Sequence, residues 1–153
     1  MKFEEHFIDS LGYEIELISR VTHEVFKRWF ENNSSITSDE FVILDMIDCN
    51  KNLSQIELAN ATLKGKAHTG KFLDSLEEKG LITRLYDTKN SRMVKIPVMT
   101  DAGKKTYNDL RIRLEEITNK IYEYYPKDKM DELKSELKKL RKVLTEEENI
   151  SFN

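Results

Sequence analysis

Apolar residues recur with a helical period along the first part of the chain. Phe7, Leu11, Ile15, Ile18, Val25 and Trp29 are separated by steps of three, four and seven residues, which is the spacing of one helix face. Ile8, Val21 and Phe26 widen this stripe. The pattern predicts one long helix over residues 4–31, followed by a loop at the polar run 32–35.

Two capping boxes, each a hydroxyl residue answered by a glutamate three positions later, predict the starts of short helices. They are Thr37-Ser-Asp-Glu40 and Ser54-Gln-Ile-Glu57. We expect Phe41, Leu44 and Ile47 to face inward from the first helix, and Ile56 and Leu58 from the second. A third helix is predicted over 65–79, with Gly80 as its C-terminal glycine.

Two β-rich runs, 81–86 and 93–99, follow the third helix and predict a hairpin with its tip at the polar segment 87–92. Val94, Ile96 and Val98 alternate with Lys95 and Pro97 in the second run. Because proline cannot donate to a strand ladder, Pro97 places this ribbon at a sheet edge.

The last third of the chain predicts two more helices. Thr100 can cap a helix over about 101–123 with an apolar face of Leu110, Leu114, Ile117 and Ile121. Pro126 ends that helix or starts the next. Met130, Leu133, Leu137, Leu140 and Leu144 then follow an a/d pattern, which covers too few heptads for an independent coiled coil. Residues 146–153 are expected to form a flexible tail.

Composition agrees with one mainly helical domain of 153 residues, since charged residues make up 35% and the chain has only 5 glycines and 2 prolines. It contains no apolar run of transmembrane length and no signal-peptide layout, and Cys49 is its single cysteine. We therefore expect a cytoplasmic protein with no membrane association and no intramolecular disulfide.

Charge is distributed unevenly along the sequence. Residues 64–95 carry eight Lys or Arg and four Asp or Glu, a balance of +4 in a chain whose net charge is −3, so the remainder carries −7. A locally basic surface on an acidic protein favours a polyanionic partner. The alternative for charge alone is an ordinary solvated helix face.

The order of these motifs resembles the MarR family of winged-helix transcriptional regulators. The resemblance rests on Thr37-Ser-Asp-Glu-Phe41, Leu53-Ser-Gln-Ile-Glu-Leu-Ala59, Lys71-Phe-Leu-Asp-Ser-Leu-Glu-Glu-Lys-Gly-Leu81 and Thr100-Asp-Ala-Gly103. The family's wing signature, Asp-x-Arg-Asp-x-Arg, corresponds to Asp87-Thr-Lys-Asn-Ser-Arg92, with Lys89 and Asn90 as departures.

The resemblance implies a mainly α fold with a small two- or three-stranded β-wing. A winged helix-turn-helix over 36–100 would be flanked by long dimerisation helices in 1–33 and 101–145. It also implies a homodimeric repressor that binds a pseudo-palindromic operator in double-stranded DNA, with helix 65–79 in the major groove and the wing (residues 87–92) at the minor groove. Relatives commonly bind small aromatic or amphipathic effectors, and the sequence identifies none.

Helical geometry selects the candidate base contacts. Thr69, Phe72, Leu73 and Leu76 share the buried side of helix 65–79, which leaves Ala67, His68, Gly70 and Lys71 toward the DNA. We expect Lys71 and His68 to read base edges, the Ala67 methyl to pack on thymine, and Gly70 to allow close approach or simply to be tolerated. If Lys71 reads no base, it is a phosphate contact.

Further candidates flank that helix. Lys64 and Lys66 are expected to contact phosphates, and Ser54 and Gln55 can bind a phosphate at a helix start, where Ser54 can equally serve as the N-cap. Lys89, Asn90, Ser91 and Arg92 are the wing candidates. Arg92 either enters the minor groove or pairs with Asp87 and braces the hairpin.

Other functional classes find little support. The sequence has no phosphate-cradling glycine loop, nucleophile motif or recognisable carboxylate pair, so we expect no enzyme, catalytic residue or cofactor. His6, His23 and His68 lack metal-ligand spacing, so no metal site is expected. The remaining rival is a winged-helix protein that acts through protein–protein contacts without specific DNA binding.

Overall fold

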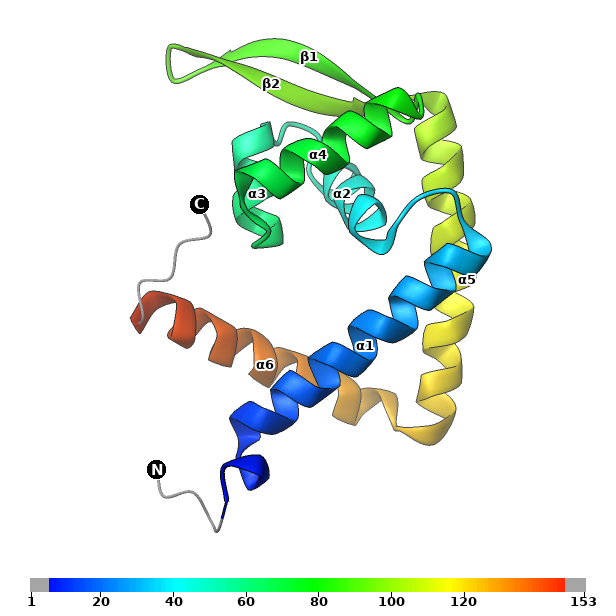
Figure 1. Ribbon diagram of the computed structural model, residues 1–153, viewed down its shortest axis with the longest axis vertical. Coiled ribbons are helices and arrows are strands. Elements are labelled where there is room, and N and C mark those ends of the chain that lie inside the picture. Colours follow the sequence, from blue (N-terminus) through cyan, green and yellow to red (C-terminus); the bar gives the residue numbers. More distant parts are fainter. Residues whose placement is uncertain (1–5, 148–153) are drawn as a thin grey trace. The chain divides into compact units, whose positions relative to one another are not determined.

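The computed structural model describes residues 6–147, and this part of the chain forms six α-helices and one antiparallel hairpin (Figure 1). A 3-10 turn at Phe7–Asp9 precedes the larger elements. These are α1 (Leu11–Asn33), α2 (Ser38–Cys49), α3 (Gln55–Thr62), α4 (Gly65–Glu78), β1 (Ile82–Lys89), β2 (Arg92–Met99), α5 (Asp101–Tyr124) and α6 (Lys127–Glu147). The predicted mainly α fold with a small β-wing is confirmed, and the wing has two strands in these residues. The chain divides into two compact units, with the boundary between Phe41 and Val42.

The first unit consists mainly of α1, and the predicted helix over 4–31 is wrong at both ends. Ser10 has an extended backbone, and its hydroxyl accepts a hydrogen bond from the Tyr13 N–H at 3.2 Å, so α1 begins only at Leu11. At the other end α1 continues to Asn33, whose side-chain amide donates to the Trp29 carbonyl at 2.8 Å. The connection to α2 therefore spans 34–37 instead of the predicted 32–35, and predicted helical residues 4 and 5 lie outside the described residues.

The apolar stripe of α1 faces solvent along much of its length. Leu11, Ile18, Val21 and Val25 are each more than half exposed. Phe30, by contrast, is buried and lies 5.5 Å from the Phe41 ring, centroid to centroid. An exposed apolar stripe of this length is unusual for a helix in a monomer.

Both predicted capping boxes are present. Thr37 Oγ1 accepts from the Glu40 N–H at 3.2 Å while the Thr37 N–H donates to Glu40 Oε2 at 2.7 Å, which starts α2. Ser54 and Glu57 exchange the equivalent pair of bonds at 3.3 and 2.7 Å and start α3. These reciprocal bonds satisfy amide donors that the first turn of a helix leaves unpaired.

The core of the second unit is formed by apolar side chains from its short helices, the hairpin and α5. Its buried members are Ile43, Leu44, Ile47, Leu58, Ala59, Leu73, Leu76, Leu81, Ile82, Ile96, Met99, Tyr107 and Leu110. The prediction that Ile56 faces inward is wrong, since its side chain is 53% exposed. Residues two apart on a helix point about 200° from each other, so Leu58 can face the core only if Ile56 does not.

The hairpin is longer and its turn tighter than predicted. Its register runs from Ile82 opposite Met99 to Lys89 opposite Arg92, which leaves only Asn90 and Ser91 in the turn. The predicted tip over 87–92 is therefore wrong in extent, because residues 87–89 and 92 belong to the strands. Asn90 and Ser91 have φ of 50° and 60°, the pair of left-handed conformations that a two-residue type I′ turn requires.

The base of the hairpin is fixed at both strand ends. β1 contacts α4, and β2 contacts α3 and α5. Pro97 is buried opposite Arg84. The predicted alternation of β2 therefore fails at Pro97, because both faces of this end of the strand are covered.

The helix ends next to the hairpin are capped as predicted. The Thr100 hydroxyl accepts from the Gly103 N–H at 3.0 Å and so caps α5. Gly80, at φ +69°, ends α4 as its predicted C-terminal glycine.

The long C-terminal helices expose most of their apolar faces. Leu110 is buried in α5, whereas Ile121 is 47% exposed, and Leu133, Leu137 and Leu144 of α6 are 39–50% exposed. Because α6 continues to Glu147, the predicted tail is wrong for residues 146 and 147, while 148–153 lie outside the described residues. Within residues 6–147, no helix has the length and apolarity to cross a membrane.

Candidate nucleic-acid interface

Helix α4 presents one buried and one exposed side, as the helical geometry predicts. Thr69, Leu73 and Leu76 are fully buried, whereas Phe72, which was predicted on the same side, is partly exposed. The opposite side exposes Ala67, His68 and Lys71, with Lys66 beside them near the helix start. Three of the four predicted base-reading positions are therefore accessible, and they place an imidazole and an ammonium group on the same short surface.

The fourth position, Gly70, lies beside Gln55 from the start of α3. A Cβ built on Gly70 would lie 3.4 Å from Nε2 of Gln55, an ordinary van der Waals distance, so the space around Gly70 does not by itself require glycine. Gln55 thus lies at the junction of the two helices, beside the exposed side of α4.

The start of α3 is occupied by protein groups. Ser54 is buried, its hydroxyl caps α3, and its N–H is donated to Glu57. The structure therefore confirms the N-capping role of Ser54, and the phosphate contact, which can hold at the same time, stays a prediction. The carboxylate of Glu57 also places a negative charge where a phosphate would approach the Ser54 amide.

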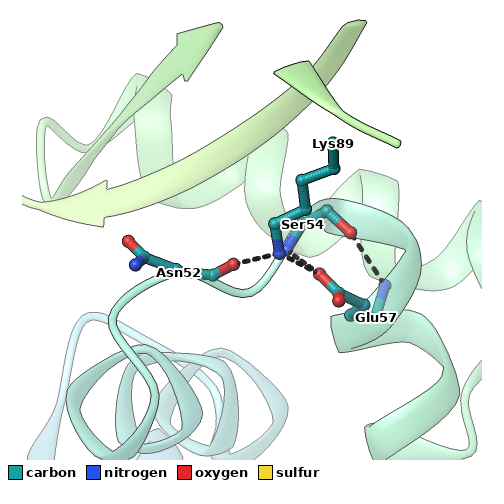
Figure 2. Close-up of polar contacts among 4 residues, drawn as sticks. All are labelled: Asn52, Ser54, Glu57 and Lys89. Atoms are coloured by element: carbon teal, nitrogen blue, oxygen red, sulfur yellow. Dashed lines mark hydrogen bonds and ion pairs between the residues drawn. The ribbon is translucent and has the colours of Figure 1, made fainter. Parts of the chain in front are cut away.

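Lys89 connects the hairpin to this capping box. Figure 2 shows its side-chain amine reaching from β1 to Glu57 Oε2, 2.7 Å away, while it also donates to the Asn52 carbonyl. The hydrogen bond from Lys89 and those from Ser54 lower the pKa of Glu57 from 4.5 to about 2. Sequence reasoning missed this contact because 32 residues separate its partners and no local pattern links them.

The remaining wing residues lie at the exposed end of the hairpin. Asn90, Ser91 and Arg92 are exposed. The Asp87 carboxylate accepts from the Thr88 N–H at 2.7 Å. Within residues 6–147 Arg92 has no carboxylate partner, so the bracing pair with Asp87 is not formed and its guanidinium is accessible.

Internal ion pairs reduce the positive charge that this region can offer a ligand. The Arg84 side chain is only 12% exposed, contacts Asp74 and lies 3.4 Å from Glu77. Arg84 and Lys89, both counted among the basic residues of 64–95, are thus paired with carboxylates. The charge available to a polyanion is correspondingly smaller than the sequence count suggests.

A groove separates the start of α3 and α4 from β2, and we call it the α3–β2 groove. It has a volume of about 260 Å³ and is lined by Ser54, Gln55, Ile56, Lys66, Met93, Val94 and Lys95. Two of the lining side chains, Ile56 and Met93, are apolar and are 53% and 77% exposed. They therefore give the groove an accessible apolar wall. The sequence analysis did not single out Met93 or Lys95 as site residues.

The described part of the chain has no candidate metal site. Residues 6–147 contain no group of three or more His, Cys, Asp or Glu side chains placed to hold an ion. Cys49 is exposed at the end of α2. The exposed surface of α4, the tip of the hairpin and the groove between them are therefore the features that a function must explain.

Comparison with known proteins identifies this arrangement. The model of the MarR family matches residues 36–94, which run from the start of α2 into β2. The chain is also 31% identical over 113 residues to the HTH-type transcriptional regulator FarR of Neisseria gonorrhoeae, across 73% of this chain and 76% of FarR. The chain belongs to the MarR family.

Solved structures share the fold of this MarR-family chain. A MepR–DNA complex from S. aureus is 20% identical, with a TM-score of 0.75 over 91% of this chain and 99% of MepR. A MarR/EmrR family regulator from Acinetobacter sp. ADP1 is 18% identical, with a TM-score of 0.78 over 88% of this chain and 94% of that protein. At these identities the likeness concerns the fold.

Proposed function

We propose that this MarR-family protein is a homodimeric transcriptional regulator, acting as a repressor, that binds a pseudo-palindromic operator in double-stranded DNA. The observation that carries the proposal is the exposed side of α4, where Lys66, Ala67, His68 and Lys71 lie next to a hairpin with an exposed basic tip. The family relationship and the DNA complex of MepR support it.

Helix α4 is the element that enters the major groove. An α-helix fits that groove, and each of the four base pairs presents a distinct donor and acceptor pattern there. Lys71 and His68 supply the polar base contacts, and the Ala67 methyl supplies an apolar one. Lys64, Lys66 and the side chain of Gln55 contact the flanking phosphates.

The hairpin tip approaches the adjacent minor groove. The accessible guanidinium of Arg92 suits the negative potential of a narrow minor groove, and Asn90 and Ser91 accompany it at the turn. Lys89 contributes differently from the expectation drawn from its sequence position, because its amine is bound to Glu57 and Asn52. Its role in this proposal is to hold the hairpin against α3.

Dimerisation is proposed on the exposed apolar faces of α1 and α6. Leu11, Ile18, Val21 and Val25 on α1 and Leu133, Leu137 and Leu144 on α6 are 39–62% exposed. A second copy related by two-fold symmetry can cover both stripes with one self-complementary interface. The regions 1–33 and 101–145 thus form the dimerisation part and 36–100 the DNA-binding part of the proposal, and two-fold symmetry matches the pseudo-palindrome.

Relief of repression by a small-molecule effector, and action in the cytoplasm, complete the proposal. The experiment that tests the DNA-binding claim is selection of bound fragments from the genome of origin, including the sequence next to the protein's own gene. Enrichment of a pseudo-palindrome with half-sites about 10–11 base pairs apart supports it. Enrichment of no sequence, together with no duplex binding at about 50 mM salt, would instead favour a protein that acts through protein–protein contacts.

A further inference from the structure

The α3–β2 groove is lined by both exposed apolar side chains and positively charged lysines. Its walls include exposed apolar side chains from different elements, Ile56 of α3 and Met93 of β2. Lys66 and Lys95 line the same groove, one from α4 and one from β2. A groove lined by both apolar side chains and two lysines suits a ligand with a hydrocarbon body and a negative charge.

Charge pairing singles out Lys95 among the hairpin lysines. Lys89 is bound to Glu57, so its charge is already compensated. Lys95 is exposed, has no carboxylate partner within residues 6–147, and lies with its Nζ 5.7 Å from the centroid of the Tyr86 ring. Such a cation–π contact favours an orientation of the ammonium group while leaving its charge intact.

The position of the groove identifies the ligand. In duplex DNA the two grooves are separated by a sugar-phosphate backbone, so a protein with a helix in the major groove and a hairpin tip in the next minor groove must straddle one strand. The α3–β2 groove lies between the start of α4 and the hairpin, which is where that strand has to pass. A deoxyribose offers C–H surface, and each phosphodiester carries a full negative charge.

We propose that the α3–β2 groove holds the sugar-phosphate backbone of that strand. Lys66 and Lys95 contact successive phosphates, Ile56 and Met93 pack against the deoxyribose between them, and Lys89 makes no DNA contact. This inference rests on the proposed DNA-binding function, and it adds Ile56, Met93 and Lys95 to the interface.

Salt dependence of affinity for a selected operator duplex tests the proposal. Each neutralised phosphate contributes about 0.9 to the slope of log affinity against log salt concentration. Lys95→Gln should therefore reduce the slope by about 0.9 per half-site, or about 1.8 for a dimer. It should also weaken selected and scrambled duplexes by the same factor. The matched variant Lys139→Gln removes the same charge from α6, where Lys139 pairs with Glu136 at 2.6 Å and does not line the groove, and it should leave the slope unchanged.

The apolar walls are tested separately. Met93→Ala and Ile56→Ala should each weaken binding to every duplex several-fold without changing the salt slope, and their thermal unfolding should stay close to that of the unmodified protein because both side chains are largely exposed. An unchanged slope for Lys95→Gln, or an equal loss for Lys139→Gln, overturns the inference. In either case, a steep salt slope for the unmodified protein would still support the proposed DNA-binding function. A flat salt slope for the unmodified protein would contradict both the proposed function and this inference.

Discussion

The amine of Lys89 on β1 lies 2.7 Å from the carboxylate of Glu57 in the capping box of α3. One carboxylate thus serves two purposes, because it closes the first turn of α3 and holds the hairpin near its tip (Figure 2). The hairpin can contact DNA in register with α4 only if its direction is fixed. We therefore regard Glu57 and Lys89 as positioning residues for the tip.

Glu57→Gln separates these two purposes. Glutamine at this position can still close a capping box, but it cannot pair electrostatically with Lys89. We expect hairpin amides to exchange hydrogen faster, selectivity for the operator over scrambled DNA to fall several-fold, and the free energy of unfolding to fall modestly because the ion pair is lost. Asp131→Asn is the matched control, since Asp131 forms a comparable exposed pair with Lys134 at 2.9 Å, away from α4 and the hairpin. Unchanged selectivity and exchange would show that the contact does not position the tip.

The lowered pKa of Glu57 sets the pH range of this contact. The folded value of about 2 lies below the usual 4.5, so the pair contributes stability that is fully present above about pH 4.5 and is lost as the pH falls toward about 2. The difference in unfolding free energy between the unmodified protein and Glu57→Gln should therefore be constant from pH 6 to 8 and shrink on acidification. Urea titrations across this range measure it, and a difference that instead changes between pH 6 and 8 would contradict the assignment.

Gly103 is predicted to be essential for joining the hairpin to α5. A Cβ at this position would lie 1.9 Å from the Leu81 carbonyl oxygen, which already accepts from the Thr100 N–H at 3.0 Å. Gly103→Ala should lower the free energy of unfolding by at least about 2 kcal/mol, because backbone must move. Gly12→Ala, whose nearest neighbour is Ser10 Oγ at 4.0 Å, should raise it by about 0.5 kcal/mol. Similar effects of the two substitutions in urea titrations would refute this account.

Leu137→Asp tests the proposed dimer. The side chain is 39% exposed in one chain, so a single chain can tolerate aspartate there, whereas a dimer would bury its charge without a partner. We expect sedimentation to show a dimer for the unmodified protein at micromolar concentration, and a monomer or an unfolded chain for the variant. A well-folded monomer for the unmodified protein would exclude the dimer.

Lys71→Ala tests direct reading of bases. If Lys71 contacts a base edge, the variant loses about 1–3 kcal/mol of discrimination at one or two base pairs in each half-site. Lys64→Ala should weaken binding to all sequences equally, because a phosphate carries no sequence information. Competition binding with single-base operator variants measures both effects. An equal loss on operator and random DNA for Lys71→Ala would make Lys71 a phosphate contact.

The sequence was a good guide wherever local rules decide the structure. Both capping boxes, the glycine end of α4 and the buried side formed by Thr69, Leu73 and Leu76 follow from spacing within a single element. The start of α1 was missed because Ser10 interrupts an otherwise periodic pattern with its own cap. Hydrophobic periodicity alone does not reveal such a competing local hydrogen bond.

The candidate site was less predictable because its key contacts are tertiary. Lys89 occupies a wing position typical of a DNA contact, and only folding brings it to Glu57. Lys95 and Met93 were read as ordinary strand residues, and they line the α3–β2 groove only because the hairpin lies along α3 and α4. Charge counting likewise overlooked the pairing of Arg84 with two acids.

The most direct test of the central claim is the affinity of the unmodified protein for a selected operator and for a scrambled duplex, measured between about 50 and 200 mM salt. We expect affinity for both to fall steeply with salt, since several phosphates are neutralised in each half-site, and the operator to bind more tightly throughout. Equal affinity for the two duplexes, a flat salt dependence, or no binding at the lowest salt would contradict the assignment of α4 and the hairpin tip as a sequence-reading DNA interface.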